Sequence, residues 1–308
     1  MNIAERFRQA YDKAMDRDCL VSPDGPRLTY GQIDELAARF ATALIEAGLQ
    51  PGERVVVQVD KSFGNVALYL AVLRAGGVYI PLNTGYTASE VRYFIENADP
   101  RIVVCRPEDL EALSAIAREL SVPATLVLGK DESVGLWADA LTFEPLEAVV
   151  TRDPDALAAI VYTSGTTGRS KGAMLTHSNL IDNAEALVEL WGFAPNDVLI
   201  HALPIFHTHG LFVATNVALL AGAIYLGDDA RRQSVLDTVA EARRAIEERP
   251  EFMVQVMAID GATPEPAEDM RGTLPLDFPL KNGVMKNKTT TLIAIPNEEF
   301  AVLAANDV

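Results

Sequence analysis

Residues 163–172 contain the residue types best suited to chemistry. These ten positions hold five aliphatic hydroxyls, three glycines and one lysine: Thr163, Ser164, Gly165, Thr166, Thr167, Gly168, Ser170, Lys171 and Gly172. Glycine lets a backbone approach a ligand closely, and successive free amides can form a nest for an anion. The hydroxyls add donors, and Lys171 adds a positive charge. This composition indicates a loop that binds phosphate or polyphosphate.

The alternative is a Ser/Thr/Gly surface turn without a ligand. The spacing matches neither the GxxxxGK[ST] pattern of a P-loop nor GxGxxG. The context still favours a phosphate loop, because an apolar strand at 158–162 leads into it and a second strand follows the lysine. A polyphosphate could accept several charge-assisted hydrogen bonds there, each contributing about 1.5–3 kcal/mol.

The elements that must position this loop alternate between helix and strand. Capping boxes at Thr29/Gln32 and Thr87/Glu90 predict two helix starts. Apolar spacing predicts further helices at 63–73, 107–120 and 179–191, and strands at 54–59, 78–82, 102–105, 125–128 and 158–162. This alternation predicts an α/β fold with a mostly parallel sheet and layered flanking helices. Beyond it, a helix is predicted at 235–246 and strands at 253–259 and 292–295.

The composition is typical of a soluble globular protein. The chain has 308 residues, of which 49% are hydrophobic and 22% charged, and a net charge of −17. An acidic chain without a basic region is a poor partner for nucleic acid or an anionic membrane. Its longest stretch without charge or histidine, 210–227, falls short of a membrane span and predicts a buried helix and strand.

The cysteines and the N-terminal sequence indicate the cellular compartment. Cys19 and Cys105 match no metal or redox spacing, and we expect Cys105 to be a buried thiol. The first residues lack the apolar core of a signal peptide. These observations predict a reduced, cytoplasmic protein.

The loop and several other segments resemble one superfamily. Tyr-Thr-Ser-Gly-Thr-Thr-Gly at 162–168, with Lys171-Gly172, resembles the ATP phosphate loop of the adenylate-forming enzymes, which include acyl-CoA synthetases, luciferases and peptide-synthetase adenylation domains. The segments 28–30, 52–55, 73–83 and 200–211 resemble further elements of that superfamily. Residues 20–227 together resemble the malonate–CoA ligases most, on the runs Asn83-Thr84-Gly85-Tyr86 and His207-Thr208-His209-Gly210. The implied fold is the N-terminal part of the large domain of these enzymes.

The resemblance implies a reaction in two steps. A carboxylate attacks the α-phosphate of ATP, giving an acyl-adenylate and pyrophosphate, and the thiol of coenzyme A then displaces AMP. ATP, Mg²⁺, coenzyme A and malonate are thus the implied ligands. The residues implied to contact the β- and γ-phosphates are Thr163, Ser164, Thr166, Thr167 and Lys171, with Gly165 and Gly168 shaping the turn.

The resemblance also implies an acid-binding segment. His207 matches a position near the reacting carboxylate, and with Thr163 it forms the implied catalytic pair. Taken alone, a histidine at this position favours a core-facing or structural role. Thr208, His209 and Gly210 complete the predicted acid-binding set, whereas His177 and His201 are expected to be structural. The sequence assigns no metal ligand.

The resemblance ends near Gly227. Beyond it we find no adenine-binding segment, no Tyr-Gly-Thr-Glu motif, no ribose-binding aspartate and no small C-terminal domain. We therefore predict that residues 1–227 are the N-terminal portion of an AMP-binding adenylation domain and that 228–308 are a divergent tail. Two hypotheses follow: an ATP-dependent acid–CoA ligase that forms malonyl-CoA, and an inactive truncated remnant that binds nucleotide or a partner chain, in an oligomer or with another protein.

Overall fold

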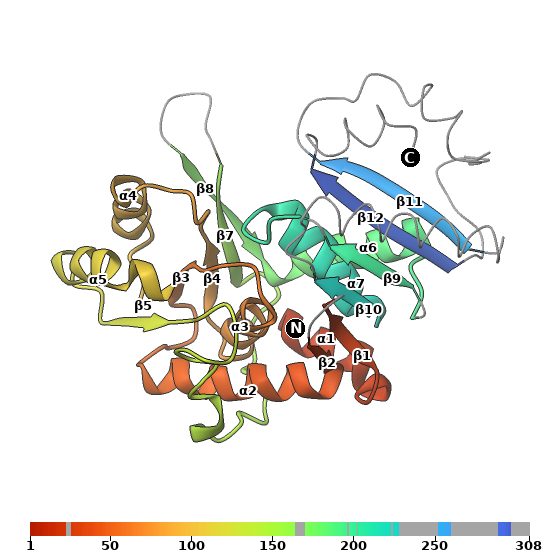
Figure 1. Ribbon diagram of the computed structural model, residues 1–308, viewed down its shortest axis with the longest axis horizontal. Coiled ribbons are helices and arrows are strands. Elements are labelled where there is room, and N and C mark those ends of the chain that lie inside the picture. Colours follow the sequence, from red (N-terminus) through yellow and green to blue (C-terminus); the bar gives the residue numbers. More distant parts are fainter. Residues whose placement is uncertain are drawn as a thin grey trace. The chain divides into compact units, whose positions relative to one another are not determined.

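The computed structural model describes residues 1–22, 26–163, 170–195, 197–201, 203–222, 224–227, 252–259 and 289–296. The described residues divide into two compact units. The first comprises Met1–Arg17, Thr29–Asp182 and Ile205–Thr208, and the second comprises the described parts of Asp18–Leu28, Asn183–Pro204 and His209–Val308. Figure 1 shows a sheet with helices beside it in each unit.

The sheet of the first unit is mostly parallel. Its described strands are β3 (Arg54–Gln58), β4 (Val78–Pro81), β5 (Ile102–Cys105), β6 (Ala124–Val127), β7 (Leu157–Thr163) and β8 (Lys171–Thr176). Their order is β6-β5-β3-β4-β7-β8. All neighbours pair in parallel except β7 and β8, which form an antiparallel hairpin. The central strands are buried along their length, which explains why they read as continuous apolar runs.

The helices of this unit precede or connect the strands of its sheet. They are α1 (Ile3–Tyr11), α2 (Tyr30–Glu46), α3 (Phe63–Arg74), α4 (Ala88–Ala98) and α5 (Leu110–Glu119), with the short 3₁₀ turns η1 (Asp12–Ala14), η2 (Pro107–Asp109) and η3 (Ala140–Thr142). Both predicted capping boxes are confirmed, at the starts of α2 and α4. The apolar residues of α3 are spaced along one helical face, which predicted the helix. In the structure, every residue of α3 is buried. A helix that is covered on all sides belongs to the interior of the unit.

One apolar core packs α4 and α5 against the sheet. It gathers Val56, Ile80, Val91, Phe94, Ile95, Val103, Cys105, Leu113, Ile116 and Tyr162, among others. Phe94 is its aromatic centre, because the ring centroids of Tyr86, Tyr93 and Tyr162 lie 4.9, 5.5 and 4.6 Å from its own. The predicted burial of Cys105 is confirmed.

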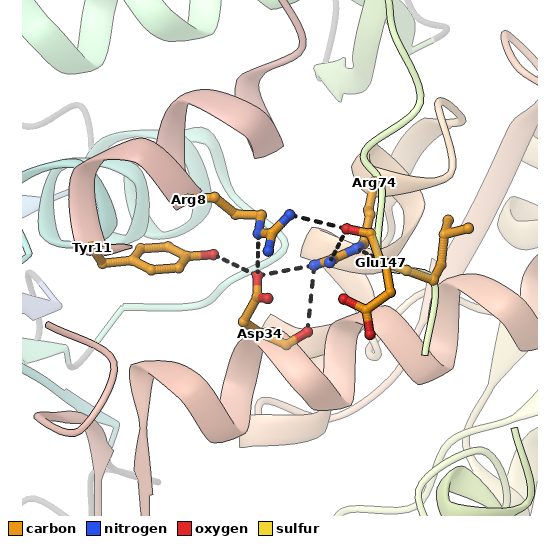
Figure 2. A network of polar contacts seen from close by, with 6 residues as sticks. Arg8, Tyr11, Asp34, Arg74 and Glu147 are labelled. Atoms are coloured by element: carbon orange, nitrogen blue, oxygen red, sulfur yellow. Dashed lines mark hydrogen bonds and ion pairs between the residues drawn. The ribbon is translucent and has the colours of Figure 1, made fainter. Parts of the chain in front are cut away.

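A buried polar cluster ties α1, α2 and α3 to the segment before β7 (Figure 2). We call Arg8, Tyr11, Asp34 and Arg74 the Arg74 cluster. The Arg74 guanidinium lies 2.9 Å from an Asp34 carboxylate oxygen, and the Tyr11 hydroxyl donates to the same oxygen at 3.1 Å. Arg74 also donates to the carbonyls of Leu146 and Glu147, at 2.7 and 3.2 Å. Each of these carbonyls is thereby satisfied without a strand partner.

The second unit holds the other sheet. Its described strands are β1 (Asp18–Val21), β2 (Arg27–Thr29), β9 (Val198–His201), β10 (Ile224–Gly227), β11 (Phe252–Ile259) and β12 (Thr289–Pro296), in the order β11-β12-β9-β10-β1-β2. The pairs from β11 to β1 are parallel. The remaining elements are α6 (His177–Trp191), which spans the division between the units, the π-helix η4 (His209–Thr215) and α7 (Asn216–Ala221).

The α/β fold class predicted from the alternation is confirmed. β11 and β12 confirm the strands predicted at 253–259 and 292–295, and they join the same sheet as β9. The stretch 210–227 contains the predicted helix, which is buried, and the predicted strand, but it begins as a π-helix rather than an α-helix. The helix predicted at 235–246 lies outside the described residues. Within the described residues, no helix is long and apolar enough to cross a membrane.

Candidate functional site

The two ends of the predicted phosphate loop form the last pair of the β7–β8 hairpin. Thr163 pairs with Lys171, and the next pair joins Tyr162 to Gly172. The Lys171 side chain belongs to an exposed residue, so its ammonium is accessible to a ligand. Gly172 faces Ile160, and a Cβ there would lie 2.8 Å from a methyl carbon of that residue. The predicted residues Ser164, Gly165, Thr166, Thr167 and Gly168 lie outside the described residues.

Helix α4 contacts β7 and the residue that leads into β8, close to this pair. The Tyr93 hydroxyl donates to the carbonyl of Ser170 at 2.8 Å, and the Tyr162 hydroxyl lies 2.7 Å from the side-chain oxygen of Asn97. Burial, with a smaller effect of neighbouring Tyr93, raises the pKa of Tyr162 to about 12. Tyr162 therefore stays a neutral hydroxyl that can donate at neutral pH. Sequence analysis did not single out Tyr93 or Asn97, because a tyrosine and an asparagine on an amphipathic helix carry no signal of a distant partner.

Polar residues follow the parallel strands at the same edge of the sheet as Thr163. Asp60 follows β3, Asn83 and Thr84 follow β4, and Arg106 follows β5. The Arg106 guanidinium lies 3.5 Å from the Asp60 carboxylate and 2.7 Å from that of Asp109. It also donates to the Thr84 carbonyl at 3.4 Å. Ligands of open parallel sheets bind at this carboxyl edge, which supports the position of the predicted loop.

The charge of Arg106 is already neutralised at this edge. Asp60, Glu108 and Asp109 all lie within 4 Å of it, and the hydrogen bond that Arg106 donates to Asp109 raises the pKa of the guanidinium further. Burial and the neighbouring carboxylates raise the pKa of the Cys105 thiol to about 12, so this cysteine is neutral. Lys171 therefore differs from Arg106 in being exposed at the end of the loop.

The predicted acid-binding residues differ in exposure. His207, Thr208 and His209 are exposed, whereas Gly210 is buried. The His207 ring lies 5.4 Å from that of Phe206, and its exposure excludes a position in the core. His207 and Thr208 belong to the first unit, and His209 and Gly210 to the second.

Gly210 belongs to a tight buried network in the second unit. Its carbonyl accepts from the Thr215 hydroxyl at 2.9 Å and lies 2.8 Å from the Nε2 of His201. A Cβ on Gly210 would overlap the carbonyl of Pro204, so glycine is required. His201 is thus buried and hydrogen-bonded, in line with the structural role expected from the sequence. π-Helices such as η4 are often found at functional sites.

His177 is buried at the start of α6. Its Nδ1 accepts from the backbone N–H of Ile3 at 3.3 Å, which joins the N-terminus of α1 to the junction of β8 and α6. Burial, the Arg152 charge and the N-terminal ammonium lower the pKa of His177 to about 4. His177 is therefore a neutral structural group at neutral pH.

Of the predicted site residues, the structure brings Thr163 and Lys171 together. The described residues contain no group of three or more His, Cys, Asp or Glu side chains suited to a metal ion. We therefore assign no Mg²⁺ ligand among the described residues and derive no step through the ion.

Comparison with known proteins assigns the family. The family described as "AMP-binding enzyme" matches residues 7–268, so the chain belongs to this family of adenylate-forming enzymes. The match extends past Gly227, and the boundary predicted there stays a prediction.

Three similar proteins show how closely the chain resembles named members of the family. The malonate–CoA ligase ACSF3 of Mus musculus is 37% identical over 56% of this chain and 29% of its own length. The oxalate–CoA ligase of Arabidopsis thaliana is 30% identical over 72% of this chain and 43% of its own. The crystal structure of ATP-bound MatB from Rhodopseudomonas palustris is 43% identical, with a TM-score of 0.72, over 83% of this chain and 50% of that one. The chain spans at most about half the length of these relatives.

Proposed function

We propose that this chain forms part of an ATP-dependent acid–CoA ligase that converts malonate to malonyl-CoA through a malonyl-adenylate. The observation that carries the proposal is the 43% identity to a structure with bound ATP, over 83% of the chain. The hairpin supports it, because an exposed lysine ends a hydroxyl- and glycine-rich loop at the carboxyl edge of a parallel sheet.

The names of the relatives support a small dicarboxylate as the acid. Two of them are named for malonate and for oxalate, each a short chain with two carboxylates. A site for such a substrate must hold one carboxylate for reaction and recognise the other. His207, Thr208 and His209 are the exposed residues that we propose for this purpose, with Gly210 shaping the segment.

In the proposed first step, an oxygen of malonate attacks the α-phosphorus of ATP. The bond to the β-phosphate oxygen breaks, giving malonyl-AMP and pyrophosphate. Both reactants are anions, so charge neutralisation and alignment lower the barrier. Lys171 would hold the β- and γ-phosphates together with the hydroxyls of Thr163, Ser164, Thr166 and Thr167.

In the proposed second step, the sulfur of coenzyme A attacks the acyl carbon. The bond to the AMP oxygen breaks, AMP leaves, and the thiol proton passes to solvent. The overall reaction consumes one ATP and releases AMP and pyrophosphate.

The test is pyrophosphate release from ATP by the purified 308-residue chain with Mg²⁺, measured with malonate, oxalate and acetate in turn. We expect release that depends on malonate and is weakest with acetate, which lacks the second carboxylate. Release with all three acids alike would contradict the proposed specificity and leave the acid–CoA ligase class intact. No release with any acid from the folded chain would contradict activity of this chain by itself and favour nucleotide or partner binding.

A further inference from the structure

We propose that Tyr93 is a positioning residue that anchors the outgoing end of the β7–β8 loop, so that Lys171 is held for phosphate binding. The inference deepens the proposed function and rests on it. Tyr93 lies 77 positions from the residue whose backbone it binds.

Ser170 lies where the chain re-enters the hairpin, because the last described strand pair joins Thr163 to Lys171. A backbone carbonyl that is shielded from water needs a hydrogen-bond donor. The Tyr93 hydroxyl donates to the Ser170 carbonyl at 2.8 Å and fixes the peptide that leads into Lys171.

The strand that follows this peptide is mostly exposed. Residues 171–174 of β8 are exposed, and β8 is an outer strand of its sheet. Apolar packing therefore does little to position the outgoing end of the loop. The hydrogen bond from Tyr93 holds this peptide from outside the hairpin.

Helix α4 is a rigid anchor for this hydrogen bond. Helix α4 begins at a complete capping box and packs Phe94 into the apolar core. The Phe94 ring contacts those of Tyr93 and Tyr162, and the Tyr162 hydroxyl is paired with Asn97 of the same helix. A site held by rigid elements loses less conformational entropy when its ligand binds.

The test is Tyr93→Phe in the full chain, because this change removes the hydroxyl and keeps the ring. We expect ATP to bind about 3- to 10-fold more weakly by calorimetry, the effect of one lost hydrogen bond. In the chain without ligand, amide hydrogen exchange of a peptide covering 170–175 should become faster.

The matched control is Tyr79→Phe. The Tyr79 hydroxyl lies 2.8 Å from the side-chain oxygen of buried Asn65, so the control loses an equivalent bond away from the loop. It should lower stability at least as much, without weakening ATP binding or changing exchange at 170–175.

The outcomes separate the inference from the proposed function. If the wild-type chain and Tyr93→Phe bind ATP equally, the inference is wrong and the proposed function is unaffected. If exchange at 170–175 does not change, Tyr93 does not anchor this end, and the inference is again wrong. If the wild-type chain binds no ATP, the proposed function is contradicted, and the role of Tyr93 in phosphate binding falls with it.

Discussion

The Arg74 cluster and the tip of the β7–β8 hairpin are two polar regions of the same unit with opposite surroundings. The cluster lies beside α2, which Figure 1 shows at the far end of the unit from the upper ends of β7 and β8. In the cluster, the charges of Arg74 and Asp34 are buried and paired, and carbonyls take the remaining donors. At the tip, the Lys171 charge is exposed while the neighbouring backbone is hydrogen-bonded to α4.

This contrast separates structural from ligand-binding polar groups. A buried group whose hydrogen bonds are complete has nothing left for a ligand, and its removal leaves an unpaired charge. An exposed charge on an anchored backbone contributes little to stability and is available for an anion. Changes in the two regions should therefore affect different measurements.

The largest effect is expected from Asp34→Ala. This change leaves the buried Arg74 guanidinium without its carboxylate and should lower the free energy of unfolding by about 3–5 kcal/mol. Denaturant titration measures it. The matched control is Glu35→Ala, which removes an exposed pair with Arg39 and should cost less than about 1 kcal/mol. Equal losses in the two variants would contradict the structural role of the cluster.

The next effect is the pH dependence of stability through His177. Its pKa is lowered to about 4 in the folded chain, against 6.5 ordinarily, so the unfolded chain binds the proton more readily. The contribution is complete above about pH 6.5 and is lost as the pH falls to about 4, to a total of about 3 kcal/mol. His177→Asn keeps an acceptor for the Ile3 N–H but does not titrate.

The measurement for His177 is the free energy of unfolding of both proteins from pH 7.5 to 4. The wild-type curve should fall more steeply than that of His177→Asn across this range. Parallel curves would show that His177 does not carry the acid sensitivity.

Lys171→Ala tests the exposed, ligand-binding region of the hairpin in this comparison. We expect ATP binding to weaken by roughly 10- to 100-fold, because one charge-assisted interaction is lost. Stability should stay within about 0.5 kcal/mol, because Lys171 is exposed. The matched control is Lys13→Ala, another exposed lysine of the same unit, which should leave ATP binding unchanged. Unchanged affinity in Lys171→Ala would make the loop assignment wrong.

The smallest effect is expected from Thr87→Ala at the start of α4. The Thr87 side chain accepts from the Glu90 amide, and the Glu90 carboxylate accepts from the Thr87 amide. Losing this cap should cost about 1 kcal/mol, measured as a lower midpoint of thermal unfolding, and Thr87→Ser should restore it. If Thr87→Ser is as unstable as Thr87→Ala, the hydroxyl is not the stabilising group.

Much of the fold could be predicted because its signals are local. The capping boxes at Thr29 and Thr87, the apolar strands and the two strands that flank the glycine-rich loop all depend on residues a few positions apart. The antiparallel pairing of those two strands was not predicted. The π-helix η4 was not predicted, since no spacing rule separates it from an α-helix in an apolar segment. The candidate site was predicted only as far as its loop and histidine segment. The contacts of Tyr93 and Asn97 with the hairpin were missed.

The sequence by itself determined the α/β alternation, the helix starts and the chemistry of the loop, because each follows from backbone periodicity and side-chain type over short spans. Only the tertiary structure decided that α3 is buried on all sides and that Arg74 meets Asp34. It alone showed that Tyr93 binds the carbonyl of Ser170. Such contacts join residues 40 and 77 positions apart, so they depend on the order of the strands and on which helix covers which face.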